Sequence, residues 1–244
     1  MSGGSHMTSS QKTRTRMDER VNDLLAHFSE CLDYFDERET FTGPSVYFHG
    51  KTLAVRRSHN TAAELLQDDL FFDYLYATLT AWGLHRMGQG NTKLVDIGEL
   101  RASLRSESAP LQSLWPHSLT DLNAGDLPDI TKRLWAALTG LRVSIAEAQI
   151  VANSKALHHV LPSLVPPIDR TYTYKFFYNR TMLSLPEHEA FGEIYQQFHR
   201  VATSKRAEIH AHTGHGFHTS ETKVVDNAII GYVKKNLRET TEHS

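Results

Sequence analysis

The sequence predicts a mainly α protein, and three features of its pattern support this prediction. Apolar residues recur at the three- and four-residue spacing of a helix face along most of the chain. Residues that cap or end helices stand at the borders of these stretches. Only residues 45–55 alternate as a strand does, so we expect at most one short β-hairpin there. The prediction is a single helical fold whose helices could form two lobes around a cleft.

The N-terminal lead is polar and carries no periodic pattern. It opens with MSGGSHM, which looks like an expression tag, so we expect residues 1–16 to be a tag and disordered lead, and residues 17–244 to form one domain. The first helix follows the lead, because the apolar residues between Val21 and Phe35 fall on one helical stripe. The hairpin prediction rests on the alternating apolar residues on either side of Gly50.

The middle of the chain predicts further helices of different lengths. One begins at Asp68 or Asp69, either of which can cap it, and ends at the glycines that follow Trp82. The polar, proline-punctuated stretch over residues 101–128 predicts short helices and loops. Asp129 can then cap a helix that is rich in apolar residues.

The last part of the chain holds three more predicted helices. Ser144 can cap the one that reaches Leu161, where Pro162 ends it because the residue before a proline is pushed out of the helical region. Another helix follows Pro186, and the last covers residues 225–232.

Composition excludes several kinds of protein. The single cysteine, Cys31, rules out an internal disulfide and a multi-cysteine zinc site. No stretch approaches the run of about 20 apolar residues that a membrane span needs, so we expect no membrane association and a cytoplasmic location. The formal net charge of −2 excludes a strongly basic nucleic-acid binder, although residues 151–244 are mildly basic, with 11 Lys and Arg against 9 Asp and Glu. No cofactor is expected.

The segment SKALHHVLPSLVPPIDRTYTYKFF, residues 154–177, gathers residues that could carry chemistry. On the predicted helix, Lys155 and His159 lie four residues apart on one face, with His158 beside them. Asp169 follows two prolines and stands where a helix cap belongs. The run after it interleaves basic residues with aromatic ones, a pattern that suits stacking on bases and contact with phosphates, although such helices more often pack in a core.

Asp169 has two interpretations that do not exclude each other. As an N-cap, its carboxylate accepts hydrogen bonds from free N–H groups at a helix start, which contributes about 1 kcal/mol. Facing a cleft, the same fixed carboxylate could stabilise a cation that develops on a substrate. Lys155 is correspondingly either a solvated or phosphate-contacting lysine or an amine nucleophile.

The order of helix, proline-containing loop, hydrophobic residue, aspartate and aromatic helix in ALHHVLPSLVPPIDRTYTYKFF resembles the helix-hairpin-helix DNA glycosylases. Upstream, LTGLRVSIAEAQIV is similar to the hairpin of that family, with Leu138 and Gly140 matching. The resemblance covers roughly residues 138–179, and it implies a glycosylase-like part over about 130–240.

The hairpin also departs from the family pattern. Arg142 replaces the second hairpin glycine and Thr139 replaces the proline. Ser144 occupies the position where bifunctional members of the family carry their lysine. Lys155 lies about three helical turns further along, so it could take that role only if its helix presents it to the same cleft.

The resemblance implies a nucleic-acid partner, DNA rather than RNA, and cleavage of the N-glycosidic bond of a flipped nucleotide. Asp169 would stabilise the oxocarbenium-like sugar or position the attacking water, and Lys155 would attack C1′ if burial or neighbouring positive charge lowered its pKa. A non-catalytic protein of the same architecture that binds nucleic acid or protein is the main alternative, because the hairpin glycine is missing. The candidate substrate-binding residues are Asn153, His158, His159, Arg170, Tyr172 and Tyr174.

A weaker alternative is a metal-dependent hydrolase. His210, His212, His215 and His218 lie within nine residues, and neutral imidazole is a common ligand of zinc, copper and nickel. Their spacing matches no strong site pattern, so we predict no metal site there.

Overall fold

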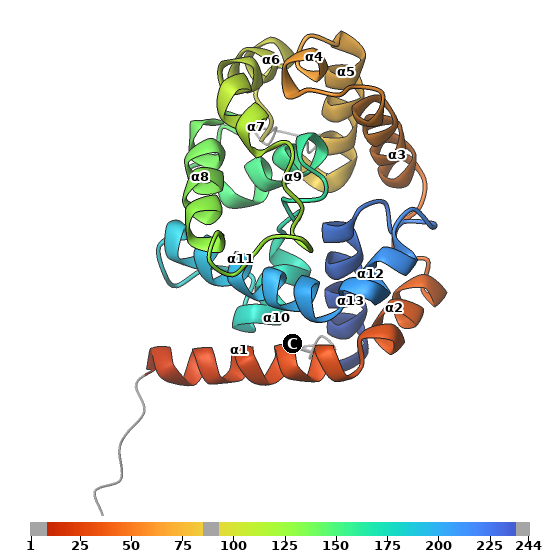
Figure 1. Cartoon of the computed structure of the whole chain (residues 1–244), viewed down its shortest axis with the longest axis vertical. Coiled ribbons are helices and arrows are strands. Elements are labelled where there is room, and N and C mark those ends of the chain that lie inside the picture. The colour runs from red at the N-terminus through yellow and green to blue at the C-terminus, as the bar shows by residue number, and fades with distance from the viewer. Residues whose placement is uncertain (1–8, 85–92, 238–244) are drawn as a thin grey trace, which may run out of the picture.

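The computed structural model describes residues 9–84 and 93–237, and it has the mainly α fold that the sequence predicts (Figure 1). These residues form thirteen α-helices and two short π-helical turns. Their only β pairing is an isolated bridge between Leu94 and Ser144. None of the helices in the described ranges has the length and apolar character needed to cross a membrane.

The elements follow one another without a repeat. The first part of the chain forms α1 (Ser9–Ala26), α2 (Phe28–Glu37), α3 (Pro44–Arg57), α4 (Ala62–Leu65), α5 (Asp69–Leu79) and η1 (Thr80–Leu84). The middle forms α6 (Ile97–Ser106), α7 (Ser108–Leu114), α8 (Leu127–Gly140) and α9 (Ile150–Val160). The last part forms η2 (Arg170–Tyr174), α10 (Lys175–Tyr178), α11 (Glu187–Ser204), α12 (Arg206–His212) and α13 (Glu221–Asn236).

The helices lie in two groups (Figure 1). One group contains α3 to α9, and the other contains α1, α2 and α10 to α13. The chain therefore crosses between the groups after α2 and again after α9. The second crossing is the proline-rich stretch that follows α9, and Asp169 stands at its end, directly before η2.

The N-terminal stripe is confirmed, although it spans two helices. Its buried residues are Val21, Leu24, Phe28, Leu32 and Phe35. The helix is interrupted at His27, between α1 and α2. The expected lead is too long, because α1 already begins at Ser9. Residues 11–16 are mostly exposed, so this extension rests on backbone hydrogen bonding and on surface contacts such as the ion pair of Arg14 with Glu193 (2.9 Å), rather than on burial.

The hairpin expected over residues 45–55 is wrong, because α3 occupies this segment. Its buried residues are His49, Thr52 and Leu53, which have helical spacing, but two of the three are polar. These polar side chains form hydrogen bonds in the interior, Thr52 with Thr78 (2.8 Å) for example. An inward face made of polar residues hides the helical period from a reading that follows apolar residues.

Helix α13 is buried along most of its length, with every residue from Thr222 to Val233 buried. It packs so closely against α2 that a Cβ atom added at Gly231 would lie 1.9 Å from the carbonyl oxygen of Cys31. Only a residue without a side chain fits there. This contact fixes α13, which carries Lys223 and Asp226, against the N-terminal helices.

Helix borders agree with the sequence at some positions and differ at others. Asp68 caps α5 by accepting a hydrogen bond from the Leu70 N–H (2.8 Å), as expected. Helix α8 begins two residues before Asp129. Helix α9 begins only at Ile150, and Ser144 instead accepts a bond from the Ala146 N–H (3.1 Å) in the loop before it.

The helical backbone breaks at Gly83, close to the predicted helix end and inside η1, because Gly83 has a φ of 82°, which disfavours side-chain-bearing residues. The second glycine expected at this helix end, Gly88, lies outside the described residues.

Candidate functional site

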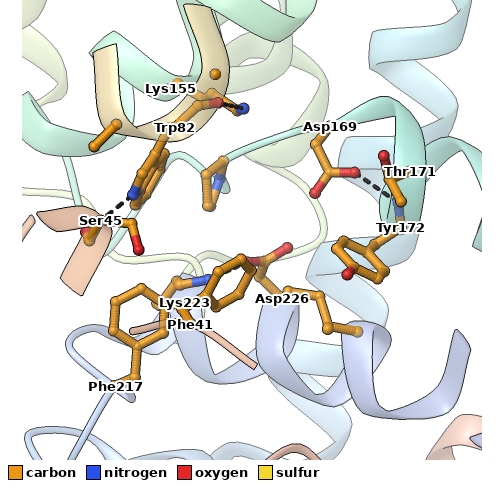
Figure 2. Close-up of a pocket in the computed structure, with 14 residues that line it drawn as sticks. Phe41, Ser45, Trp82, Lys155, Asp169, Thr171, Tyr172, Phe217, Lys223 and Asp226 are labelled. Atoms are coloured by element: carbon orange, nitrogen blue, oxygen red, sulfur yellow. Dashed lines mark hydrogen bonds and ion pairs between the residues drawn. The ribbon is translucent and has the colours of Figure 1, made fainter. Parts of the chain in front are cut away.

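A cavity of about 340 Å³ lies between the two groups of helices (Figure 2). We call it the aromatic cavity, because four aromatic side chains lie in its wall: Phe41, Trp82, Tyr172 and Phe217. Two lysines and two aspartates join them, and they are Lys155, Asp169, Lys223 and Asp226. Its volume falls within the range of about 300–1,000 Å³ that small-molecule sites have.

The local sequence fixes Asp169 at the edge of this cavity. Asp169 has an extended backbone after the two prolines, and its Oδ1 accepts a hydrogen bond from the Tyr172 N–H (2.6 Å). Its own N–H donates to the Thr173 hydroxyl (3.1 Å). The predicted capping role is confirmed. The carboxylate also lines the cavity, so the same side chain caps the helix and faces an open space.

Lys155 reaches the same cavity from α9. Its Nζ donates to the carbonyl oxygen of Trp82 (3.2 Å) and lies 5.8 Å from the centre of the Trp82 ring. Burial lowers the pKa of Lys155, and the carboxylates of Asp169 and Asp226 oppose this effect. The lysine and Asp169 therefore face one pocket, as Figure 2 shows.

A second cavity of about 210 Å³ adjoins the first. The two share Trp82, Lys155 and Asp169 in their walls. The second cavity adds the basic residues Lys93 and Arg170, and it adds Ser144 from the loop before α9. Lys155 and Asp169 thus stand at the junction of an aromatic space and a more polar one.

A buried ion pair lies across the aromatic cavity from Lys155. Lys223 and Asp226, each only 2% exposed, are joined by a hydrogen bond from Nζ to Oδ2 of 2.5 Å. The ammonium group also lies 4.6 Å from the centre of the Phe217 ring and 5.3 Å from that of Phe41. Burial raises the pKa of the Asp226 carboxyl, and the Lys223 ammonium opposes this effect.

Lys223 and Asp226 are cavity residues that no motif in the sequence predicted. The signal for them is a lysine and an aspartate, three residues apart, inside the apolar run TKVVDNAII. Charged residues are almost never fully buried unless they are paired, so such a spacing in a buried helix indicates a paired and enclosed site. Phe41 and Phe217 were also missed, because both lie in loops without a periodic pattern.

The structure places His158 and His159 behind the cavity wall rather than in it. Together with His49, they form a cluster of three buried histidines whose rings pack against one another and against Trp82. Neither histidine of the sequence motif lines either cavity, because both point into the interior of the fold.

The hydrogen bonds of this histidine cluster are consistent with neutral rings. Nδ1 of His159 lies 2.7 Å from the Lys155 carbonyl oxygen, so it must donate. Its Nε2 then accepts from Nδ1 of His49 (2.9 Å), whose Nε2 accepts from the Thr219 hydroxyl (2.7 Å). Burial lowers the pKa of all three histidines, to about 4 for His159.

The other predicted substrate-binding residues divide between the cavities and the interior. Tyr172 lines the aromatic cavity, and the exposed Arg170 lines the second one. Tyr174 is almost fully buried and lines neither. Asn153 is buried as well, and its Nδ2 donates to two backbone carbonyl oxygens at the end of α8, those of Leu138 (2.8 Å) and Leu141 (3.0 Å). Asn153 therefore closes a helix end, and it lines neither the aromatic cavity nor the second one.

The C-terminal histidines have separate partners. His218 contacts both carboxylate oxygens of Asp36 (3.0 Å), while His210 lies 3.4 Å from Glu221. His212 bonds to a backbone carbonyl, and His215 is exposed. Among the residues that the structure describes, no group of three His, Cys, Asp or Glu side chains is placed to hold a metal ion.

Comparison of the chain with protein families, curated proteins and solved structures finds no match.

Proposed function

We propose that this protein cleaves the N-glycosidic bond of a nucleotide extruded from DNA, with the base held in the aromatic cavity. The observation that carries the proposal is the position of Lys155 and Asp169 at the junction of the two cavities. A base in the aromatic cavity and a backbone phosphate near Lys93 and Arg170 would bring the sugar between these two side chains.

The aromatic wall suits a base that has left the DNA stack. Extruding a nucleotide costs a few kcal/mol of stacking and pairing. Stacking on aromatic side chains returns about 1–3 kcal/mol per base. Contacts on the protein side fix the ring that would stack on the base. Nε1 of Trp82 donates to the Ser45 carbonyl oxygen (3.2 Å), and the ring centre lies 5.0 Å from that of the buried His49.

Asp169 and Lys155 would perform complementary steps. As the bond from C1′ to the base breaks, positive charge develops on the sugar, and the fixed carboxylate of Asp169 stabilises it. The base leaves with the bonding electrons and takes up the proton that the attacking amine of Lys155, or an attacking water, releases as it bonds to C1′. Burial lowers the pKa of Lys155 and so raises the fraction of neutral amine, which is the form that can bond to C1′.

The order of elements also supports the proposal. Helix α8, the loop over residues 141–149 and helix α9 follow one another as in the helix-hairpin-helix resemblance, and Asp169 comes after them with a proline-containing loop before it. The resemblance does not extend to the lysine of bifunctional members. Lys155 of α9 would take its place, because it lines the same cavity as the aspartate.

The test is base release from DNA. Duplex oligonucleotides that each carry one deaminated, oxidised or alkylated base are incubated with the protein, and alkali then cleaves at abasic sites. We expect cleavage of duplexes that carry at least one of these classes of base. For Asp169→Asn we expect a cleavage rate at least about a hundredfold lower than that of wild type, since removing one such electrostatic group costs about 10²–10³ in rate. Asparagine caps helices as well as aspartate does, so the fold is retained.

A matched control is Asp68→Asn. Asp68 is also a capping aspartate, but it stands at the start of α5 and lines neither cavity. This variant should release the base at the wild-type rate. If wild-type protein releases no base from any duplex, or if Asp169→Asn is as active as wild type, the proposal is wrong.

One observation favours the non-catalytic alternative. In the loop that would contact a DNA phosphate, the Arg142 N–H already donates to the Ser103 hydroxyl (2.6 Å). A non-catalytic DNA-binding protein would bind duplexes with an affinity that falls steeply with salt, and it would leave every base attached. Trapping with borohydride separates the two further, because only an enzyme whose Lys155 forms a Schiff base becomes linked to DNA, and Lys155→Ala removes the link.

A further inference from the structure

Asp226 presents a buried acceptor that nothing in the described part of the chain satisfies. Within residues 9–84 and 93–237, its Oδ1 has no hydrogen-bond partner, while Oδ2 accepts from Lys223. Three other buried polar atoms share this property, those of Arg101, His158 and Asn227, but none of these residues lines the aromatic cavity. Leaving a buried acceptor unpaired is unfavourable, so a partner that enters the cavity with an N–H would be bound more tightly.

The ion pair offers two opposite hydrogen-bonding functions side by side. Asp226 supplies an acceptor, and Lys223, bonded to it, supplies a donor. Aromatic rings of Phe41 and Phe217 cover the lysine, and Trp82 lies further along the wall (Figure 2). A flat ring that stacks between such walls would turn one polar edge toward the pair.

We propose, building on the proposed function, that Asp226 and Lys223 select bases whose edge carries a ring N–H beside a carbonyl oxygen, as in uracil and hypoxanthine. The N–H donates to Oδ1 of Asp226, and the carbonyl accepts from Lys223. A carbonyl oxygen has two lone pairs and accepts over a wider range of directions than the single lone pair of a ring nitrogen. The edge of adenine or cytosine, which pairs an amino group with a bare ring nitrogen, fits this site less well.

The cavity wall must adjust slightly for this contact. Oδ1 of Asp226 has almost no surface open to water, so a base reaches it after a neighbouring side chain shifts. Phe41 can supply this shift, because it is partly exposed and lies in the loop between α2 and α3. The N–H of the base then gives Oδ1 of Asp226 a charge-assisted hydrogen bond, which no residue in the described ranges gives this oxygen.

Binding of free bases tests the inference without any cleavage step. Ligand-observed NMR titration measures the affinity of the wild-type protein for uracil and hypoxanthine, for their ring N-methylated forms, and for adenine and cytosine. Methylation removes the N–H and leaves the carbonyl in place. We expect about a tenfold to hundredfold weaker binding of the methylated forms, which corresponds to the loss of one hydrogen bond to a charged group.

Asp226→Asn provides the second arm. The Lys223 ammonium would turn the amide oxygen toward itself, which places an NH₂ donor where Oδ1 was, so binding of hypoxanthine should fall about tenfold or more. Asp36→Asn is the matched control, because Asp36 pairs with His218 and does not line the cavity. It should bind hypoxanthine as wild type does. Thermal unfolding of both variants checks that they are folded.

The outcomes for this inference and for the proposed function differ. Base binding that depends on Asp226, without base release from DNA, supports the inference and contradicts the function. Release of N-methylated or amino-edge bases as fast as of uracil or hypoxanthine supports the function and overturns the inference. Equal binding of methylated and unmethylated bases, or no binding of any base, also overturns it.

Discussion

Replacing Gly231 by alanine probes the contact that holds α13 in place. The added Cβ would lie 1.9 Å from the Cys31 carbonyl oxygen and 2.9 Å from its carbon. Both obstacles are backbone atoms of α2, so a whole helix must move and no flexible side chain can yield. Overpacking of this kind costs about 1–3 kcal/mol, and we expect the upper end here. Alanine regains about 1 kcal/mol of helix propensity, which leaves a net loss of about 2 kcal/mol in the free energy of unfolding.

The assay is thermal unfolding followed by circular dichroism. For a chain of this size, a loss of about 2 kcal/mol lowers Tm by about 4–8 °C. Gly192→Ala is the control, because Gly192 lies within α11 and a Cβ there would meet nothing within 4 Å. That variant should gain about 0.5–1 kcal/mol and raise Tm. A Gly231→Ala protein as stable as wild type would refute the close packing of α2 against α13.

Two further predictions concern stability. The pKa of His159 is about 4 in the fold and about 6.5 in the unfolded chain, so the unfolded state binds the proton first as pH falls below about 6.5. At pH 5 this residue alone lowers the free energy of unfolding by about 2 kcal/mol relative to neutral pH. His49 and His158 act in the same direction, while Asp226, whose pKa is raised, opposes them. Urea unfolding at pH 5 and 7 checks the net loss, and equal midpoints would contradict it. Asn153→Leu leaves two buried carbonyl oxygens without donors, so it should cost at least about 2 kcal/mol in the same assay, whereas an unchanged midpoint would argue against its structural role.

Helices with an apolar face could be predicted from the sequence, whereas helices with a polar inward face could not. The stripe from Val21 to Phe35 and the cap at Asp68 appear in the structure as expected. Helix α3 was mistaken for a hairpin, because its buried face carries His49 and Thr52, whose partners come from distant parts of the chain. A local sequence pattern cannot predict the hydrogen bond between His49 and His159, because these residues are 110 positions apart.

Part of the candidate site could be predicted from the sequence, and part of it could not. A shared cavity for Asp169 and Lys155 is a condition of the glycosylase interpretation, and neither the prolines before Asp169 nor the helical spacing around Lys155 determines it from the sequence. The opposite wall was not predicted, since Phe41 and Phe217 lie in loops and Lys223 with Asp226 comes from a helix near the C-terminus. These residues meet only through the packing of α13 against α2.

The most direct measurement is a crystal structure of the Asp169→Asn protein bound to a duplex that contains the preferred base. We expect one nucleotide turned out of the duplex, its base in the aromatic cavity beside Asp226, and its C1′ within about 3.5 Å of the Lys155 Nζ, the distance of a reactive approach. A bound duplex with every base stacked and the cavity empty would contradict it.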